Sequence, residues 1–429
     1  MRFIGIKNNK IVMISDKNFS SEGVQVVKAS EELNNISNSE LIINYKLRNN
    51  DLVSKKSVRK ASELKVAIVS NWMMQCGLSQ YCQSIIPELA KSIKEFKLFI
   101  EKNDNPTGPL NIVGDLVIPN ENIITCWERG KSLQSLVSEV KSYDPDIILI
   151  NHEFGLFPNA ANFISMMSQF SDYRVITVMH SVFRHMDKLI EEAAMPEIIV
   201  HLQGAKDVLI NEKNVNGKVY VINHGCFPCV DKTRLWNFYK SEHTFIQQGY
   251  LFRYKGYEQS IKATAILKDK YPDVFFTGLC SVSNQSLIEN EMYFNELMEL
   301  VDKLGLQENV GLIKGYQSDV VIDSYLRTNK AAVFPYIENL QHLCFGSSGA
   351  APTSMAKAIP VITSNGNHFK SLPTIKANTP EEIAVALDKL FSDKKFANEQ
   401  VEKQNKYLED NSWKNTATKY INIFENKVI

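Results

Sequence analysis

Two cations stand in a loop where they could neutralise a diphosphate. Arg253 and Lys255 lie within the stretch 249–256, directly after a strand-like apolar run at 244–248 and before a helix-like run that begins at Tyr257. Ligands of α/β proteins bind outside the carboxyl ends of parallel strands, and Arg and Lys are suited to binding phosphate there. A solvated charged loop is the simpler interpretation, so a second signal is needed.

That second signal is a run of small residues farther along the chain. Ser347, Ser348 and Gly349 precede a helix-like stretch at 352–358 and a strand-like run at 360–363. Small residues at the start of a helix leave backbone N–H groups free for an anion, and the helix dipole favours it. The two loops together predict a phosphate site in the C-terminal half of the chain.

The elements that must position these loops form two successive series of apolar strands alternating with helices. The predicted strands of the first series are 65–70, 147–150, 175–178, 198–200 and 219–222, and those of the second are 244–248, 274–278, 310–313, 331–335 and 360–363. Continuous apolar runs are typical of parallel sheets covered on both faces. We therefore expect an α/β fold of two Rossmann-like parallel-sheet domains that face each other across a cleft.

The same patterns predict where the chain divides. Short apolar runs at 3–6 and 11–14 indicate a hairpin within a small β-rich appendage and connector at 1–63. The predicted domains are 64–243 and 244–405, followed by a C-terminal helix at 406–429 that could pack back across the junction. Helices are expected at 79–96, 257–270, 381–391 and 397–425.

Composition excludes several other classes of protein. Forty-eight basic residues balance 48 acidic ones, so no global field attracts nucleic acid or anionic lipid. Seven cysteines without regular spacing do not form a disulfide framework, and Cys226 and Cys229 lack further ligands for a metal site. No apolar run of about 18 residues and no signal peptide is present. The sequence therefore predicts no transmembrane segment, reduced thiols and a cytoplasmic location.

Ordered motifs in both halves resemble family 4 glycosyltransferases, the retaining enzymes of glycosyl transferase group 1. In the second half the order resembles the donor domain of that family: Gly249-x3-Arg253-x-Lys255-Gly256, Phe276-Thr277-Gly278, Lys314-Gly315-Tyr316, Pro335-Tyr336, Ser347-Ser348-Gly349 and Pro360-Val361-Ile362. In the first half the matching segments are the glycine loop 72–81, Asn151-His152-Glu153-Phe154-Gly155, Val178-Met179-His180-Ser181 and Asn223-His224-Gly225.

This resemblance implies a GT-B enzyme that moves a hexose or pentose from a nucleotide-sugar to an acceptor with retention of configuration. It implies an acceptor domain at 64–243, a donor domain at 244–405 and no cofactor or metal. Arg253 and Lys255 would bind the diphosphate and stabilise the leaving group, and His180 would face the transferred sugar. The other implied donor-binding residues are Gly77, Gly249, Lys314, Gly315, Tyr316, Ser347, Ser348 and Gly349. His152 and Glu153 would lie on the acceptor side.

The chain departs from the family pattern at one place. Many members carry two glutamates eight positions apart, and counting back from Pro360 those positions hold Phe345 and Thr353. The chain resembles a subset that uses a Ser-Ser-Gly loop instead, and Glu338 upstream is a candidate for compensating the loss. The missing pair motivates an alternative function, a catalytically inactive module that binds nucleotide-sugars.

NAD-dependent oxidoreductases share this doubly wound architecture. Such an enzyme would need Gly-x-Gly-x-x-Gly after its first strand, and the segment 69–77 lacks it. The acceptor of a transferase is open between a glycan, a lipid-linked molecule, a small molecule and a modified DNA base in a viral or mobile-element system. His152 and His180 could instead be core-edge histidines, and Glu153 a structural carboxylate.

Overall fold

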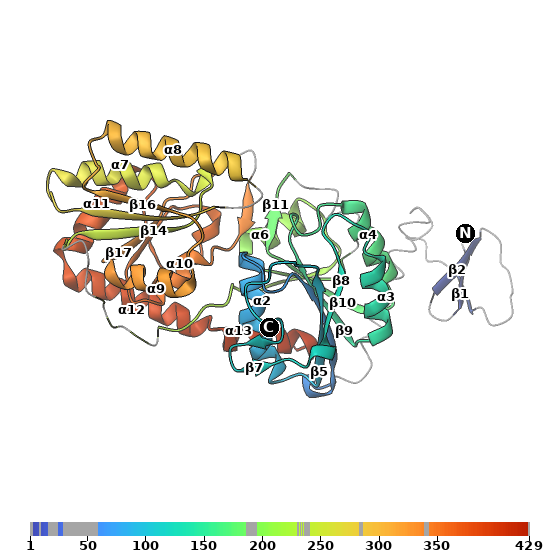
Figure 1. Cartoon of the computed structure of the whole chain (residues 1–429). Coiled ribbons are helices and arrows are strands. Elements are labelled where there is room, and N and C mark those ends of the chain that lie inside the picture. The colour runs from blue at the N-terminus through green and yellow to red at the C-terminus, as the bar shows by residue number, and fades with distance from the viewer. Residues whose placement is uncertain are drawn as a thin grey trace.

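The computed structural model describes residues 3–7, 10–15, 25–28, 59–185, 195–229, 231, 233, 235, 241–282, 286–338 and 343–427. Two α/β domains dominate it (Figure 1). The first has a seven-stranded sheet of order β13-β12-β10-β9-β4-β5-β8, and the second a six-stranded sheet of order β16-β15-β14-β17-β19-β20. Every strand pair in both sheets is parallel. The expected pair of Rossmann-like domains is confirmed.

The first sheet is buried on both faces, as its continuous apolar strands predict. Its strands are β4 (Lys65–Ser70), β5 (Glu95–Glu101), β8 (Ile123–Trp127), β9 (Ile147–His152), β10 (Arg174–Met179), β12 (Glu197–Val200) and β13 (Lys218–Val221). The helices are α2 (Gly77–Ala90), α3 (Gln134–Tyr143), α4 (Ala160–Gln169) and α6 (Gln203–Asn211). Alternate residues of a strand point to opposite faces. Ile148 and Ile150 therefore pack with α3, α4 and α6, and Ile147 and Leu149 pack with α2.

The second sheet follows the same plan. Its strands are β14 (Thr244–Tyr250), β15 (Phe275–Ser281), β16 (Val310–Lys314), β17 (Ala331–Phe334), β19 (Val361–Thr363) and β20 (Ile375–Lys376). Phe245 packs on one face with α7 (Tyr257–Lys268), α8 (Leu287–Lys303) and α11 (Pro380–Ser392). Ile246 packs on the other face with α9 (Asp319–Thr328), α10 (Ala350–Met355) and α12 (Lys394–Asp410).

Short elements complete the described chain. β1 (Phe3–Lys7), β2 (Lys10–Ser15) and β3 (Gln25–Lys28) form an antiparallel sheet of order β2-β1-β3, which confirms the predicted hairpin strands, whereas the turn residues 8–9 lie outside the described residues. A small antiparallel pair, β6 (Ile112–Val113) and β7 (Leu116–Val117), belongs to the first domain. Single 3-10 turns are η2 (Ala61–Glu63), η3 (Asn120–Asn122), η4 (Arg253–Lys255) and η6 (Asn367–Phe369).

The last helix, α13 (Trp413–Phe424), returns to the first domain and packs beside α2 (Figure 1). Trp413, Tyr420 and Phe424 are buried in the same core cluster as α2 and β4. The hydroxyl groups of Tyr420 and Tyr81 lie 2.7 Å apart, and Arg174 donates to the carbonyl oxygen of Phe424 at 2.7 Å. The chain therefore crosses between the domains twice.

Two helix predictions were wrong. The helix expected at 79–96 ends at Ala90, and β5 begins at Glu95, where apolar residues alternate around Lys97 and so have the period of a strand. The single helix expected at 397–425 is two helices, because the side chain of Ser412 accepts a hydrogen bond from N–H of Asn415 and caps a new one. The predicted boundary after residue 405 consequently falls inside α12.

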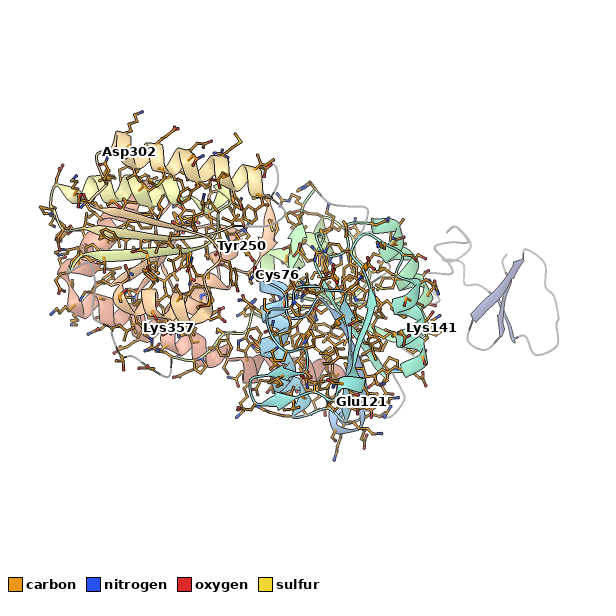
Figure 2. The ribbon with its side chains drawn as sticks, viewed as in Figure 1. Cys76, Glu121, Lys141, Tyr250, Asp302 and Lys357 are labelled. Atoms are coloured by element: carbon orange, nitrogen blue, oxygen red, sulfur yellow. The ribbon has the colours of Figure 1, made fainter. Side chains whose placement is uncertain are left out.

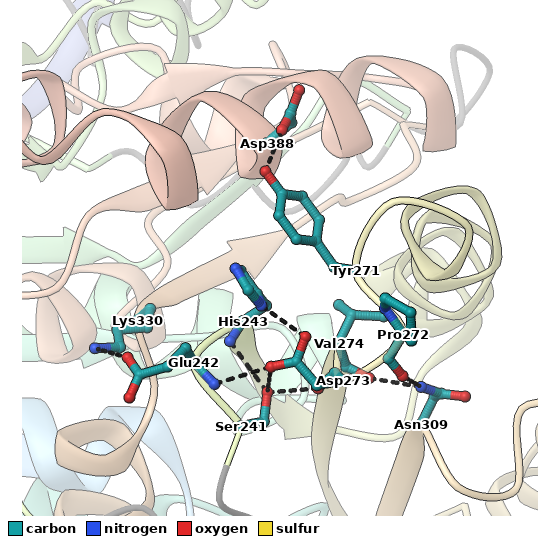
Figure 3. A network of polar contacts seen from close by, with 10 residues as sticks. All are labelled: Ser241, Glu242, His243, Tyr271, Pro272, Asp273, Val274, Asn309, Lys330 and Asp388. Carbon is teal, nitrogen blue, oxygen red and sulfur yellow. Dashed lines mark hydrogen bonds and ion pairs between the residues drawn. The ribbon is translucent and has the colours of Figure 1, made fainter.

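The chain enters the second domain through a network of hydrogen bonds at the amino ends of its strands (Figure 3). The Asp273 carboxylate accepts from Nδ1 of His243 at 2.7 Å and from the N–H of Glu242 at 3.1 Å. Ser241 donates to the carbonyl oxygen of Asp273 at 2.5 Å. The His243 ring stacks on Tyr271 with 4.1 Å between centroids. This network anchors the linker at the sheet edge opposite to that where the predicted phosphate loops lie.

Candidate functional site

A cleft of about 2190 Å³ lies between the two domains. Its walls are the loops that follow β4, β9 and β10 in the first domain and those that follow β14 and β15 in the second, with the start of α10. Both sheets therefore present their carboxyl edges to one space, which is where open α/β sheets bind ligands. Figure 2 shows Tyr250 and Cys76 close together across this space, and the Tyr250 hydroxyl donates to the carbonyl oxygen of Gln75 at 2.6 Å.

Lys255 faces the cleft from the second domain and is partly buried. Its Nζ donates to the Tyr336 hydroxyl at 2.6 Å and lies 3.9 Å from the centre of that ring. Burial lowers the pKa of Lys255, since desolvation disfavours the charged ammonium. Gly256 makes this turn possible, because it has a positive φ and a Cβ there would lie 2.3 Å from the carbonyl oxygen of Pro335.

The Ser-Ser-Gly loop approaches the same lysine. Ser347, Ser348 and Gly349 all line the cleft, and Oγ of Ser348 lies 3.3 Å from the Tyr336 hydroxyl. Tyr336 thus connects the two loops that were predicted separately. The helix after the loop, α10, spans Ala350–Met355 and begins before the predicted stretch 352–358.

Arg253 lies outside the cleft, although it is two residues from Lys255. Its guanidinium forms two hydrogen bonds to the Glu296 carboxylate, at 2.6 and 2.7 Å, and lies over the ring of Tyr293. These side chains line a separate pocket of about 670 Å³. The cause is the 3-10 turn η4, in which successive side chains are a third of a turn apart, so residues 253 and 255 point to different sides.

The implied donor-binding stretch Lys314-Gly315-Tyr316 is divided in the same way. Lys314 is paired with Glu291 at 2.7 Å and does not line the cleft, whereas Tyr316 does. Gly315, between them, has a φ of 118°, which lets the chain turn from the strand into the cleft wall. Of this motif, Tyr316 is the residue that the structure brings into contact with the cleft.

Three histidines gather on the first-domain wall. Nδ1 of His180 lies 3.3 Å from Nε2 of His201, and Nδ1 of His201 donates to the carbonyl oxygen of Ile222 at 2.9 Å. Nε2 of His180 lies 3.2 Å from Oδ1 of Asn151, an oxygen that accepts hydrogen bonds. His224 packs edge-on against His201.

Desolvation favours the neutral form of all three histidines. Burial lowers the pKa of His180 well below its usual value, with smaller contributions from His201 and His224. Burial likewise lowers the pKa of His201 to about 3 and that of His224 to about 4. His201 was missed by the motif reasoning, yet it directly follows the apolar strand β12 just as His180 follows β10. The position of His201 directly after an apolar strand could therefore have identified it as a candidate site residue.

His152 does not lie on the acceptor side, and this prediction was wrong. It is the last residue of β9 and continues the face of Ile148 and Ile150, which α4 covers. Its ring is fully buried and stacks on Phe157, and neither ring nitrogen has a hydrogen-bond partner among the described residues. Desolvation lowers the pKa of His152 to about 3. It is a core histidine.

Glu153, the next residue, does line the cleft. Its carboxylate accepts a hydrogen bond from N–H of Phe154 at 3.1 Å. Burial raises the pKa of Glu153, partly offset by hydrogen bonds from Ser181 and Phe154. A carboxyl group of raised pKa beside His180 is suited to hold or exchange a proton with a hydroxyl group in the cleft.

Two predicted glycines also lie in the cleft wall. Gly77 is the first residue of α2, and a Cβ there would meet no atom within 4 Å. Gly249 has a φ of 140°, a backbone conformation that favours glycine. Gly77 therefore leaves open space beside the helix start, while Gly249 is required by the turn of the chain.

The residues discussed as replacements for the missing glutamates have other contacts. The Glu338 carboxylate accepts a hydrogen bond from N–H of Asn367 and packs against Gly366, outside the main cleft. Thr353 lines the cleft and donates to the carbonyl oxygen of Gly349 at 2.9 Å. Phe345 is buried in a core cluster of the first domain. Glu338 is thus placed to hold a loop.

The cysteines and helices of the described chain define neither a metal centre nor a membrane span. No group of three or more His, Cys, Asp or Glu side chains suited to a metal ion occurs within the described ranges. The Cys226 thiol donates to the carbonyl oxygen of Asn411 at 3.1 Å, and neither it nor Cys229 forms a disulfide. In the part of the chain that the structure describes, no helix is long and apolar enough to cross a membrane.

Solved structures that are similar to this chain in fold include a glycosyltransferase and proteins bound to UDP or a UDP-sugar analogue. The structure of trehalose-6-phosphate from E. coli bound with UDP-2-fluoro glucose has a TM-score of 0.67 at 13% identity, covering 85% of this chain and 99% of that one. Anabaena Alr3699/HepE in complex with UDP has a TM-score of 0.64 at 11% identity, covering 85% and 100%. A glycosyltransferase from Rickettsia africae has a TM-score of 0.63 at 14% identity, covering 85% and 98%.

The fold is therefore GT-B, the class that the motif order implied. A family comparison makes the assignment more specific: residues 232–407 match glycosyl transferases group 1. This match to part of the chain supports the resemblance stated from the motifs. No curated protein sequence matches the chain.

Proposed function

We propose that the chain transfers a sugar from a nucleotide-sugar to an acceptor with retention of configuration. The observation that carries the proposal is Lys255, a cation held in the cleft by a tyrosine hydroxyl. Among the described residues it forms no ion pair, whereas Lys91, Arg129 and Lys357 in the same cleft are each paired with a carboxylate. Lys255 is thus available to an anionic ligand.

The donor diphosphate would lie between Lys255 and the loop 347–349. The lysine would stabilise the negative charge that develops on the leaving phosphate, and the two serine hydroxyl groups would donate to phosphate or sugar oxygens. Tyr316 would contact the base. Arg253 has no part in this proposal, since Glu296 holds it outside the cleft.

The first-domain wall would receive the sugar and the acceptor. His180, which is neutral, would hydrogen-bond to the transferred sugar, and Glu153 would anchor an acceptor hydroxyl. In retaining enzymes of the resembled family the leaving phosphate is thought to help deprotonate the acceptor, so no protein nucleophile is required.

The donor screen should begin with UDP-sugars. One similar structure is bound with UDP-2-fluoro glucose and another is in complex with UDP. Both chains are below 15% identical to this one, so they support a nucleotide-sugar and leave the choice between hexose and pentose to experiment.

Charge favours an uncharged, hydroxyl-rich acceptor. The cleft residues of the first domain and of α13 packed on it include four carboxylates, Glu88, Glu101, Asp115 and Glu153, and three cations, Lys91, Arg129 and Lys414. Lys91 and Arg129 are already paired, with Glu88 and Glu101. A phosphate-rich acceptor such as DNA would meet net negative charge there. We therefore propose a glycan or a small polyol in preference to a modified DNA base, which salt-dependent binding to duplex DNA would instead support.

The donor assignment is tested by thermal unfolding in the presence of UDP-, GDP-, ADP- and CMP-linked sugars. A ligand at 100 times its Kd stabilises the folded state by about 2.7 kcal/mol. At least one donor should raise the melting temperature of the wild type and of Arg253→Ala, and should lose this effect on Lys255→Ala. Full stabilisation of Lys255→Ala would show that the lysine does not bind the donor.

The alternative of an inactive binding module stems from Phe345 and Thr353 at the expected glutamate positions. Incubation with the stabilising donor and a panel of sugar acceptors separates the two functions. Release of free nucleotide with formation of a glycosylated product supports transfer. Tight donor binding without turnover on any acceptor supports the binding module.

A further inference from the structure

A two-stranded antiparallel sheet joins the two domains inside the site. β11 (Ser181–Phe183) follows His180 in the first domain, and β18 (Cys344–Gly346) precedes the loop 347–349 in the second. Three residues of each strand pair in register, and we call this pair the interdomain sheet. Figure 1 shows β11 at the boundary between the domains. The histidine wall and the Ser-Ser-Gly loop are thus connected through backbone hydrogen bonds.

Phe345, in the centre of β18, packs into the core of the opposite domain. It pairs with Val182 and belongs to the same buried cluster as the sheet and helices of the first domain. Its ring lies against α6 at Gly204, where an added Cβ would come within 2.8 Å of the ring. A glycine at this position therefore makes room for a side chain contributed by the other domain.

The residue after Phe345 is held equally closely. A Cβ on Gly346 would lie 3.1 Å from the carbonyl oxygen of His180 and 3.1 Å from Oγ of Ser181. The carbonyl oxygen of Gly346 accepts a hydrogen bond from Nδ1 of His368 at 2.6 Å. The segment that enters the Ser-Ser-Gly loop is therefore fixed from both domains.

We propose that Phe345 is a positioning residue that seats the loop 347–349 between His180 and Lys255. This inference rests on the proposed donor site. Phe345 contacts neither the donor nor the lysine; it acts by fastening β18 to β11. Ser348, three residues on, then reaches the Tyr336 hydroxyl that holds Lys255. At a position where many relatives carry a glutamate, this chain uses a phenylalanine to join its domains.

The substitution Gly204→Ala distinguishes a role of Phe345 in positioning the loop 347–349 from a general contribution to the stability of the fold. Alanine in a helix is favoured over glycine by about 1 kcal/mol, so the substitution should not weaken α6 itself. The added Cβ should, however, displace the ring of Phe345 from its packing position against α6. Gly108→Ala is the matched control, because its added Cβ would meet only Sδ of Met73, at 4.0 Å.

The first arm of the test needs no ligand. Amide hydrogen exchange is measured for 181–183 and 343–346 in the wild type, Gly204→Ala, Phe345→Ala, Phe345→Leu and Gly108→Ala. Exchange in both segments should become at least about tenfold faster in Gly204→Ala and Phe345→Ala, with the melting temperature of Gly204→Ala maintained. Unchanged protection in Gly204→Ala would overturn the proposal.

The second arm measures the effect on the donor, with UDP-glucose, GDP-mannose and ADP-glucose as probes. Misplacement of a binding group by about 1 Å can cost a hundredfold. We expect the KM for the active donor to rise at least about tenfold in Gly204→Ala, with partial recovery in Gly204→Ala/Phe345→Leu. A KM within twofold of wild type would contradict the positioning role. If no probe binds the wild type, the donor proposal fails and hydrogen exchange alone decides whether Phe345 joins the domains.

Discussion

On the first-domain wall of the cleft, His180, His201 and His224 lie against one another, His201 buried and the other two partly buried. Desolvation lowers the pKa of each and so favours the neutral imidazole. On the second-domain wall, Lys255 carries a charge and shares a tyrosine hydroxyl with Ser348. Neutral imidazoles suit sugar hydroxyl groups, and a cation with hydroxyl donors suits a diphosphate. In the proposed function, each wall would therefore receive one end of a nucleotide-sugar, with the bond to be broken between them.

The largest effect should come from removing the charge on the second wall. Lys255→Ala should lower kcat/KM by about a hundredfold to a thousandfold, because it removes a group that stabilises the leaving phosphate. Arg253→Ala should remain within about threefold of wild type, since Glu296 holds that side chain outside the cleft. Initial rates of nucleotide release measure both. Equal losses of kcat/KM in the two variants would contradict the different roles given to Lys255 and Arg253.

The neutral histidines should make the folded state sensitive to acid. The pKa of His201 is about 3 in the folded protein, compared with about 6.5 in the unfolded chain. Its contribution to the free energy of unfolding is therefore fully present above pH 6.5. That contribution is lost as the pH falls toward 3, by about 1.4 kcal/mol per pH unit. Chemical denaturation of wild type and His201→Gln at pH 7.5, 6 and 5 should therefore converge as the pH falls. A difference in unfolding free energy that stays constant with pH would show that folding does not lower the pKa of His201.

Removing the imidazole that faces the sugar should have a smaller effect on turnover. We expect His180→Ala to lower kcat about tenfold, equivalent to about 1.4 kcal/mol, and to leave the Kd of the free nucleotide unchanged. Rate assays and calorimetry with the nucleotide alone give the two values. Loss of nucleotide affinity in this variant would place the diphosphate on the first-domain wall instead.

The smallest effect should be at the linker network of Figure 3, which lies at the amino ends of β14 and β15, whereas the cleft lies at their carboxyl ends. Burial raises the pKa of Asp273, but hydrogen bonds from His243 and Glu242 outweigh it and lower the pKa overall. Its contribution to stability is present above the unfolded pKa of about 3.9 and is lost below it. Because the pair is partly exposed, Asp273→Asn should cost below about 1 kcal/mol at pH 7. Activity should be unchanged, and a large loss of turnover would reveal coupling between linker and cleft.

Much of the fold was predictable because its strands are continuous apolar runs. The runs at Ile147–Ile150 and 331–334 are apolar throughout and lie between turn signals, so a buried strand was the expected structure. The two successive series of such runs predicted two sheets. The strand β5 was missed because Lys97 interrupts its apolar run and the preceding helix has a similar composition. The break at Ser412 depends on a single side-chain cap.

The site was harder to predict because it depends on small rotations and on long-range pairing. The 3-10 turn decides that Lys255 and not Arg253 faces the cleft, and the length of β9 decides that His152 is in the core. Neither is visible in the composition of a motif. The pairing of β11 with β18 joins segments of different domains, so no local pattern in either strand indicates it.

The most direct test of the donor site is a crystal structure with the nucleotide-sugar that stabilises the chain most. Phosphate oxygens should lie within about 3 Å of Nζ of Lys255, with the loop 347–349 on the other side and the sugar against His180. Arg253 should still be paired with Glu296. A diphosphate bound at Arg253, or bound away from Lys255, would contradict the proposed site.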